Sequence, residues 1–234
     1  MPKESKEGQK NNSSILKITK SDQYRTVGEL LEESQPSSTY YALLVLSSFI
    51  VACGLLLDSP SIVIGGMLVT PMLTPVLATA LSISAGEPKT LRRLGTLLGK
   101  SFLIVAGAAI LMTLVFGLPQ SVLTLDNSIR TAILYFVVAI VSGVAATFAW
   151  VRKEVAAVLP GIAIAVSLVP PVAAVGIWLS ALQFETARFY FLVFLFNFFG
   201  IIMGSVLVFS LLRFYRANKK IQQEEKVADV AENK

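Results

Sequence analysis

Two proline-broken segments inside long apolar runs constrain the fold of this chain more than any other feature. Residues 65–75 read GGMLVTPMLTP and lie within an apolar run from Ser61 to Ala85. In a water-soluble helix such a cluster of glycine and proline ends the helix. Here apolar sequence continues on both sides. A second stretch of this kind, PGIAIAVSLVPP at 160–171, lies within the apolar run 155–182.

The composition places these runs in a membrane. The 234 residues are 54% hydrophobic and 15% charged, with a mean hydropathy of +0.70. Soluble proteins have a charged fraction of about 25%. Several apolar runs also exceed the roughly 18 residues that indicate a membrane-spanning helix. We therefore expect an all-α integral membrane protein.

The residue inventory argues against several classes of chemistry. The chain has no histidine, and its one cysteine, Cys53, lies in the first apolar run. An intrachain disulfide is therefore excluded, and metal binding or histidine-based acid–base catalysis is disfavoured. No acid pair or activated nucleophile lies deep in an apolar run, so we expect no enzyme activity, metal or cofactor. The net charge of +5 comes from basic residues at the ends of runs, which favours membrane topology over nucleic-acid binding.

The apolar runs predict six spans within a membrane domain at 40–212. A polar segment, 1–39, precedes this domain, and a charged tail, 213–234, follows it. Residues Ile15 to Glu33 predict either a short interfacial helix anchored by Leu30 and Leu31 or a flexible lead-in. The spans are expected at 40–57, 61–85, 94–116, 129–150, 155–182 and 189–212.

The basic residues predict the orientation of the chain. With the N-terminus inside, nine basic residues of the loops and tail fall on the inner side: Lys89, Arg92, Arg93, Arg152, Lys153, Arg213, Arg216, Lys219 and Lys220. The outer loops then hold only Asp58, Asp126 with Arg130, and Glu185 with Arg188. Six spans then leave both termini in the cytoplasm. Alternatively, the two broken segments form re-entrant hairpins, which would reverse part of this topology.

The two broken segments also suggest an internal repeat with halves at 40–116 and 129–212. Over residues 66–81, a shift of 95 residues pairs four identical residues: Gly66 with Gly161, Leu73 with Leu168, Pro75 with Pro170 and Ala78 with Ala173. Three spans in each half would make the second half enter from the opposite side. Inverted repeats with discontinuous helices are a recurring plan of transporters.

The prolines predict where polar backbone becomes available inside the membrane. A proline removes the donor for the carbonyl four residues earlier, so Pro71 would free the carbonyl of Met67. In the same way Pro75 would free that of Pro71, and Pro170 and Pro171 would free those of Val166 and Ser167. Unpaired carbonyls in lipid must be satisfied by protein or by water in a cavity. The candidate solute-binding residues are Thr70, Pro71, Thr74, Pro75, Ser167, Pro170 and Pro171, with Asn197 and Lys100 nearby. The alternative is a pair of kinked, fully packed helices.

Other polar and small residues refine this expectation. Lys100 is the charged residue deepest within a predicted span, where it either contacts a solute or snorkels to the membrane surface. No Asp or Glu lies deep in a span, which disfavours coupling through carboxylates. The motifs Gly95-x-x-x-Gly99 and Gly200-x-x-x-Gly204 predict close helix packing, within the chain or between subunits.

Three segments carry a resemblance to a known family: GLLLDSPSIVIGGMLVTPMLTPVL at 54–77, LPGIAIAVSLVPPVAAVGI at 159–177 and FLFNFFGIIMGSVLVF at 194–209. In these segments the chain resembles the membrane family known as domain of unknown function 389. In that family, Asn often replaces Asp58 and Gly often replaces Thr74, which weakens both as ligands. The resemblance implies a multi-span protein of the prokaryotic plasma membrane and carries no activity with it.

Two functional hypotheses follow. In the first, a small solute or ion, preferably neutral or anionic, moves through a site at the two breaks. In the second, the chain is a non-transporting membrane scaffold that forms a homo-oligomer and contacts lipid, and its breaks are dry.

Overall fold

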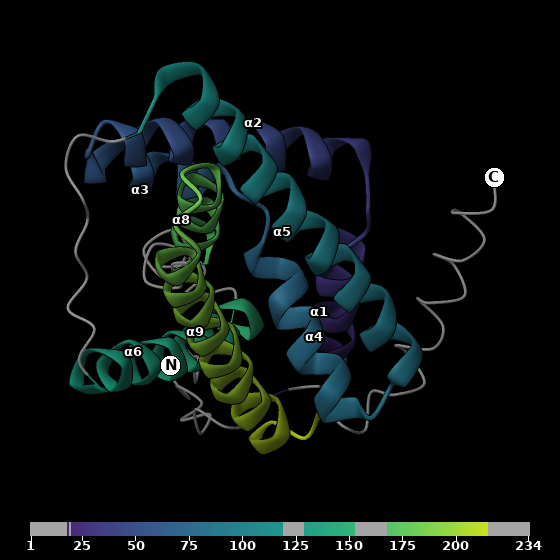
Figure 1. Cartoon of the computed structure of the whole chain (residues 1–234). Coiled ribbons are helices and arrows are strands. Elements are labelled where there is room, and N and C mark those ends of the chain that lie inside the picture. Colours follow the sequence, from purple (N-terminus) through teal and green to yellow (C-terminus); the bar gives the residue numbers. More distant parts are fainter. Residues whose placement is uncertain (1–17, 19, 119–128, 153–167, 215–234) are drawn as a thin grey trace, which may run out of the picture.

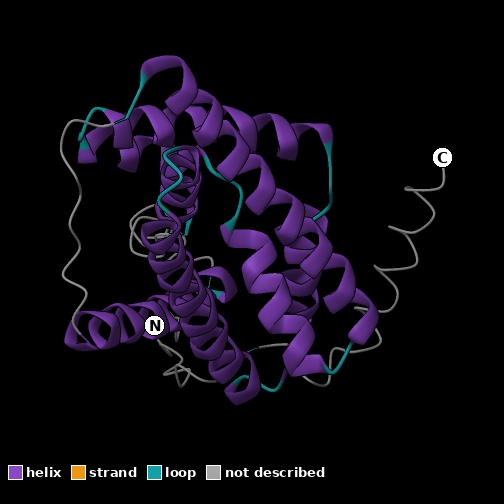
Figure 2. Ribbon diagram, in the orientation of Figure 1, coloured by secondary structure: helices purple, strands orange, loops and turns teal. Residues whose placement is uncertain are grey.

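The structure, a computed structural model, describes residues 18, 20–118, 129–152 and 168–214, with the backbone alone at 129–132. Over these residues every regular element is a helix, as Figure 2 shows. The all-α prediction is therefore confirmed for the described part of the chain. The helices, labelled as in Figure 1, are α1 (Lys20–Glu33), α2 (Ser38–Leu56), α3 (Pro60–Val69), α4 (Leu73–Ala85), α5 (Pro88–Phe116), α6 (Ile129–Val151), α8 (Val169–Ser180) and α9 (Phe184–Leu211).

The lengths of the helices support an integral membrane protein. Four of the described helices, α2, α5, α6 and α9, are long and apolar enough to cross a membrane. The pair α3 and α4 makes a fifth span if it is taken as one helix bent by 57°. The remaining apolar helix, α8, has 12 residues, and the rest of the predicted fifth span, 155–167, lies outside the described residues.

Two helices begin before the spans predicted for them. Helix α5 begins at Pro88, before the span predicted at 94–116, so Lys89, Arg92 and Arg93 belong to the helix. Helix α9 begins at Phe184, before the span predicted at 189–212. Lysine and arginine are good helix formers, and a helix continues past the point where its apolar run ends.

Glycine residues bring α6 and α9 into close contact. A Cβ atom at Gly200 would lie 2.6 Å from the Ala139 Cβ atom, and one at Gly143 would lie 2.8 Å from the Ile201 Cα atom. Gly204 likewise approaches the backbone of α6. The Ser205 hydroxyl donates a hydrogen bond of 3.2 Å to the Gly143 carbonyl. Close packing at Gly200-x-x-x-Gly204 is therefore confirmed within the chain.

The α5 glycines behave differently. Gly95 and Gly99 are exposed, and a Cβ atom at either position would meet nothing within 4 Å. The buried face of α5 lies elsewhere on the helix and includes Leu94, Leu97 and Ser101. The motif Gly95-x-x-x-Gly99 therefore mediates no packing within the described chain, and its role between subunits stays a prediction.

The helices of the two predicted halves end at matching positions. Helices α2 and α6 end at residues 56 and 151, α4 and α8 at 85 and 180, and α5 and α9 at 116 and 211. Each second position lies 95 residues after the first, which is the shift that pairs the residues of the predicted repeat. Helices α4 and α8 each pack against both α5 and α9. The main apolar core lies among these four helices.

Helix α1 packs against the bundle instead of lying apart from it. It contacts α4 and α6, and Val27 and Leu30 are fully buried. The Gln23 side chain donates a 2.8 Å hydrogen bond to the Leu212 carbonyl, and the Arg25 guanidinium donates one of 3.2 Å to the Val151 carbonyl. These two carbonyls lie at the C-terminal ends of α9 and α6, where no helical donor remains. The predicted helix is therefore present, with Leu30 anchored in protein.

Candidate functional site

The first break lies between Thr70 and Met72. Helix α3 ends at Val69, and Thr70 has an extended backbone (φ −72°, ψ 127°). The Thr70 hydroxyl donates a 3.1 Å hydrogen bond to the Gly66 carbonyl. The Thr70 N–H donates one of 3.3 Å to the Met67 carbonyl. The prediction that Pro71 frees the Met67 carbonyl is therefore wrong, because the chain tightens to a bond across three residues before the proline.

Helix α4 starts immediately after this turn. Thr74 and Pro75 are its second and third residues, and both are buried. The first N–H groups of any helix have no partner within it, so a proline here removes no helical hydrogen bond. The Pro75 carbonyl accepts a 2.7 Å hydrogen bond from the Thr79 hydroxyl. Pro75 therefore begins a half-helix instead of interrupting one.

The Thr74 hydroxyl has a partner that sequence reasoning missed. It donates a hydrogen bond of 3.5 Å, at the long limit for such a bond, to the Glu33 carboxylate at the end of α1. This carboxylate lies at the start of α4, where the helix dipole favours negative charge. Burial and the neighbouring charges of Glu29 and Glu32 raise the pKa of the Glu33 carboxyl, while the Thr74 hydrogen bond opposes the shift. Much of the Glu33 side chain is exposed, which weakens the effect of burial.

The second break is described only from residue 168 onward, and this part resembles the start of α4. Helix α8 begins at Val169, so Pro170 and Pro171 lie in its first turn. They start this helix in the way that Pro75 starts α4. Pro171 is buried and Pro170 half-buried. Ser167 and the carbonyls of Val166 and Ser167 lie outside the described residues, so the predictions that concern them stay predictions.

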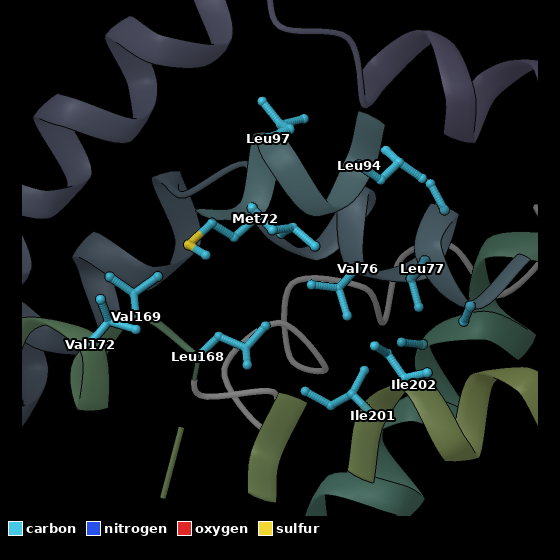
Figure 3. Close-up of a cluster of buried hydrophobic side chains, with 14 of the residues drawn as sticks. Met72, Val76, Leu77, Leu94, Leu97, Leu168, Val169, Val172, Ile201 and Ile202 are labelled. Carbon is cyan, nitrogen blue, oxygen red and sulfur yellow. The ribbon is translucent and has the colours of Figure 1, made fainter. Parts of the chain in front are cut away.

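The two half-helices start at one apolar cluster. Figure 3 shows Met72, which precedes α4, and Leu168, which precedes α8, in one cluster with Val76 of α4, Val169 of α8 and Ile201 of α9. Of these, Met72, Leu168 and Val169 are each 3% exposed. The described side chains between the two starts are therefore close-packed and apolar. The Thr70 and Thr74 hydroxyls donate their hydrogen bonds to Gly66 and Glu33, which are not part of this cluster.

The other two candidate residues are placed differently from each other. Asn197 is buried in α9, one helical turn before Ile201, so it lies on the face of α9 that meets the cluster. Lys100 is exposed, whereas its neighbours Leu97 and Ser101 are buried. The structure therefore brings Thr70, Pro71, Thr74, Pro75, Pro170, Pro171 and Asn197 toward one region and leaves Lys100 on the outer face of α5.

The sequence predicts only part of what places Glu33 beside Thr74. Val27, Leu30 and Ser34 are buried at spacings of three and four residues, which is the pattern of one helix face. This pattern predicts which side of α1 packs. It does not say which element α1 packs on.

Comparison with known proteins adds a family and no activity. The sequence profile of the family described as Domain of unknown function (DUF389) matches residues 67–203, which contain all nine candidate site residues. The chain is also similar to an uncharacterized protein, MJ0678, of Methanocaldococcus jannaschii, with 27% identity over 176 residues. The match covers 72% of this chain and 52% of that relative, so the chain spans about half the length of the relative. No solved structure matches the chain. More than half of the chain fits the family profile, and the protein is therefore a member of the DUF389 family.

Proposed function

We propose that this protein is a six-span membrane transporter or channel, built from two inverted halves, for a small solute or ion. The halves are 40–116 and 129–212. The matching helix ends support this plan, because all three fall at one 95-residue offset. With three spans in each half, both termini lie in the cytoplasm and the protein resides in the plasma membrane.

The packing of the helices also supports two related halves. Exchanging α4 with α8 and α5 with α9 converts the α4–α9 contact into the α8–α5 contact, and both contacts are present. The same exchange converts α4–α5 into α8–α9, and both of these are present as well. Exchanging α2 with α6 relates α2–α5 to α6–α9. A pseudo-two-fold axis between the halves accounts for these pairs.

The observation that carries the transport proposal is the meeting of the two half-helix starts at one place in the bundle. The positive ends of α4 and α8 lie at the cluster around Met72 and Leu168. Two positive ends favour a neutral or anionic solute, as does the lack of deep acids in the spans. Apolar side chains fill the space around Met72 and Leu168, so passage of a solute requires these side chains to move apart.

Water accessibility of the breaks tests this proposal. In a Cys53→Ala background, single cysteines replace Thr74 and Ser167 in turn, and a charged thiol reagent is added to either face of sealed vesicles. We expect both sites to react, at rates that change when the transported solute is added. A cysteine at Ala78, one turn further into α4 and fully buried, serves as the unreactive control.

Flux measurements then decide between classes of solute. Proteoliposomes are screened with neutral and anionic solutes against protein-free vesicles. Transport is supported if the cysteines at the breaks react and if a solute enters the proteoliposomes faster than it enters protein-free vesicles. Unreactive breaks, combined with flux equal to that of protein-free vesicles for all solutes, contradict it.

A second candidate is the non-transporting oligomeric scaffold. The apolar packing around Met72 and Leu168 favours it, since a scaffold needs no hydrated path. The open glycines of α5 offer a face for another subunit. This candidate predicts unreactive breaks together with stable oligomers in cross-linking.

A further inference from the structure

Lys100 is a charged side chain on the outer surface of a helix that is long and apolar enough to span the membrane. Helix α5 carries it 12 residues after Pro88, and the residue is exposed. Lys100 makes no ion pair or hydrogen bond with any residue of the described chain. An ammonium group facing hydrocarbon without a partner is expensive. An anion bound beside Lys100 would lower this cost.

The surroundings of Lys100 fit a phosphate group. Arg92 lies eight residues earlier, about 12 Å along the axis at 1.5 Å per residue, and is also exposed. Helical side chains lean toward the N-terminus, so the Lys100 ammonium extends toward the turn that contains Thr96. Arg92 supplies a guanidinium suited to phosphate on the other side of this turn. Helix α5 contains no Asp or Glu, so no acid in the helix competes for these cations.

Thr96 lies between these two cations and is exposed, and the helix surface beside it is bare. Gly95 and Gly99 are exposed, and nothing within 4 Å would meet a Cβ atom at either one. A bulky headgroup can therefore approach the backbone at Gly95 and Gly99, beside Thr96. The Thr96 hydroxyl is turned back onto its own helix, where it donates a 3.1 Å hydrogen bond to the Arg92 carbonyl.

Beyond Lys100 the same face becomes apolar. Leu103 and Leu114 are 69% and 70% exposed, and Gly107 between them is also exposed. At 100° per residue these three positions lie on the stripe that Arg92, Thr96 and Gly99 begin. Along this face, the two cations and the open backbone at Gly99 come first, and the apolar residues Leu103, Gly107 and Leu114 follow. A phospholipid presents its phosphate and its acyl chains in the same order.

We propose that this face of α5 binds one anionic phospholipid. Its phosphate lies between Arg92 and Lys100, beside the bare backbone at Gly99, and its acyl chains run along Leu103, Gly107 and Leu114. A second copy of the chain fits this face less well. A symmetric contact over the same glycines would bring Lys100 close to its own counterpart, and like charges in a dry contact repel. The site is separate from the helix breaks and does not depend on transport.

Binding of a fluorescent phosphatidylglycerol to the detergent-solubilised full chain tests the proposal, with phosphatidylcholine of the same acyl length as the neutral comparison. We expect phosphatidylglycerol to bind more tightly, and Lys100→Gln and Arg92→Gln each to raise its dissociation constant roughly tenfold, as for loss of one charge-assisted hydrogen bond. Gly99→Leu should weaken binding with no change in charge, because it covers the bare backbone at this position.

Arg213→Gln is the matched control, since it removes an exposed cation at the end of another helix. It should leave binding within about twofold of the unmodified chain. Equal binding of the two lipids, or equal losses for Lys100→Gln and Arg213→Gln, would overturn the proposal. So would a rise in the dimer fraction of Lys100→Gln, which would identify the face as a subunit contact. Lys100 and Arg92 contact no other described side chain through a polar bond, and unchanged thermal stability of each variant verifies that it folds.

Discussion

The adjacent glycines Gly65 and Gly66 of α3 allow a stringent test of how α2 and α3 pack. A Cβ atom at Gly66 would lie 2.6 Å from the Cγ2 methyl of Val51 and 3.0 Å from the Val51 backbone nitrogen. A Cβ atom at Gly65 would meet nothing within 4 Å. The substitutions Gly66→Ala and Gly65→Ala therefore add the same methyl group to one helix, once into a filled space and once into an open one.

The structure sets the size of the expected difference. Ordinary contact with a Cβ atom begins at 3.4 Å, so the Val51 methyl must retreat by about 0.8 Å and its backbone nitrogen by about 0.4 Å. Val51 is fully buried, and a β-branched side chain in a helix has one strongly preferred rotamer, so the displacement passes to the spacing of α2 and α3. Overpacking of this kind costs about 1–3 kcal/mol. The gain in helix propensity, about 1 kcal/mol for Gly→Ala, is common to both variants and cancels in the comparison.

Reversible unfolding in mixed micelles, followed by tryptophan fluorescence, measures this difference. We expect Gly66→Ala to be less stable than Gly65→Ala by about 1–3 kcal/mol. Equal stability of the two variants, or a more stable Gly66→Ala, would mean that α2 and α3 do not approach each other at this glycine.

Three further predictions concern polar contacts between helices. The Tyr40 hydroxyl donates a 2.8 Å hydrogen bond to the Ser101 hydroxyl. Tyr40→Phe should therefore destabilise the chain by about 0.5–1.5 kcal/mol in the same unfolding assay. An unchanged unfolding midpoint would argue against this hydrogen bond. The Glu33 carboxyl has a raised pKa in the folded chain, so docking of α1 should weaken as pH rises from the ordinary Glu pKa through the raised one and stay constant above it. Hydrogen exchange of the α1 amides at different pH values measures this docking. Glu33→Gln keeps an acceptor for the Thr74 hydroxyl and should abolish the pH dependence. If the variant keeps the pH dependence, another group titrates. Arg25→Ala removes the hydrogen bond to the last carbonyl of α6. The α1 amides should then exchange faster, while those in the middle of α9 stay protected. Equal protection of α1 in the variant and the unmodified chain would count against docking through Arg25.

Local signals predicted much of the fold. The apolar runs located the helices, and Gly86 and Gly117 end α4 and α5 with positive φ angles of 72° and 86°. Such angles are readily reached by glycine, so a glycine after an apolar run is a reliable end signal. The starts of α5 and α9 were harder to predict, because hydropathy marks the membrane boundary while the backbone hydrogen bonds continue beyond it.

The helix breaks at the candidate site could be located from the sequence more readily than their contacts. The two proline-rich segments lie at the starts of α4 and α8. The Met67 carbonyl accepts a hydrogen bond from Thr70 because α3 ends just before Pro71. The position of a proline alone does not predict where the preceding helix ends. The contact of Glu33 with Thr74 joins elements 41 residues apart, and no local periodicity encodes such a pairing.

The docking of α1 has a consequence for the order of membrane insertion. The Gln23 side chain is bonded to the Leu212 carbonyl, 189 residues later in the chain. During synthesis from the N-terminus, α1 emerges first, and its last partner emerges only after α9 has been made. Loop closure over such a separation delays this contact until the spans have assembled. Helix α1 therefore completes its contacts only after α9 has been made, whereas its partners α4 and α6 are made earlier.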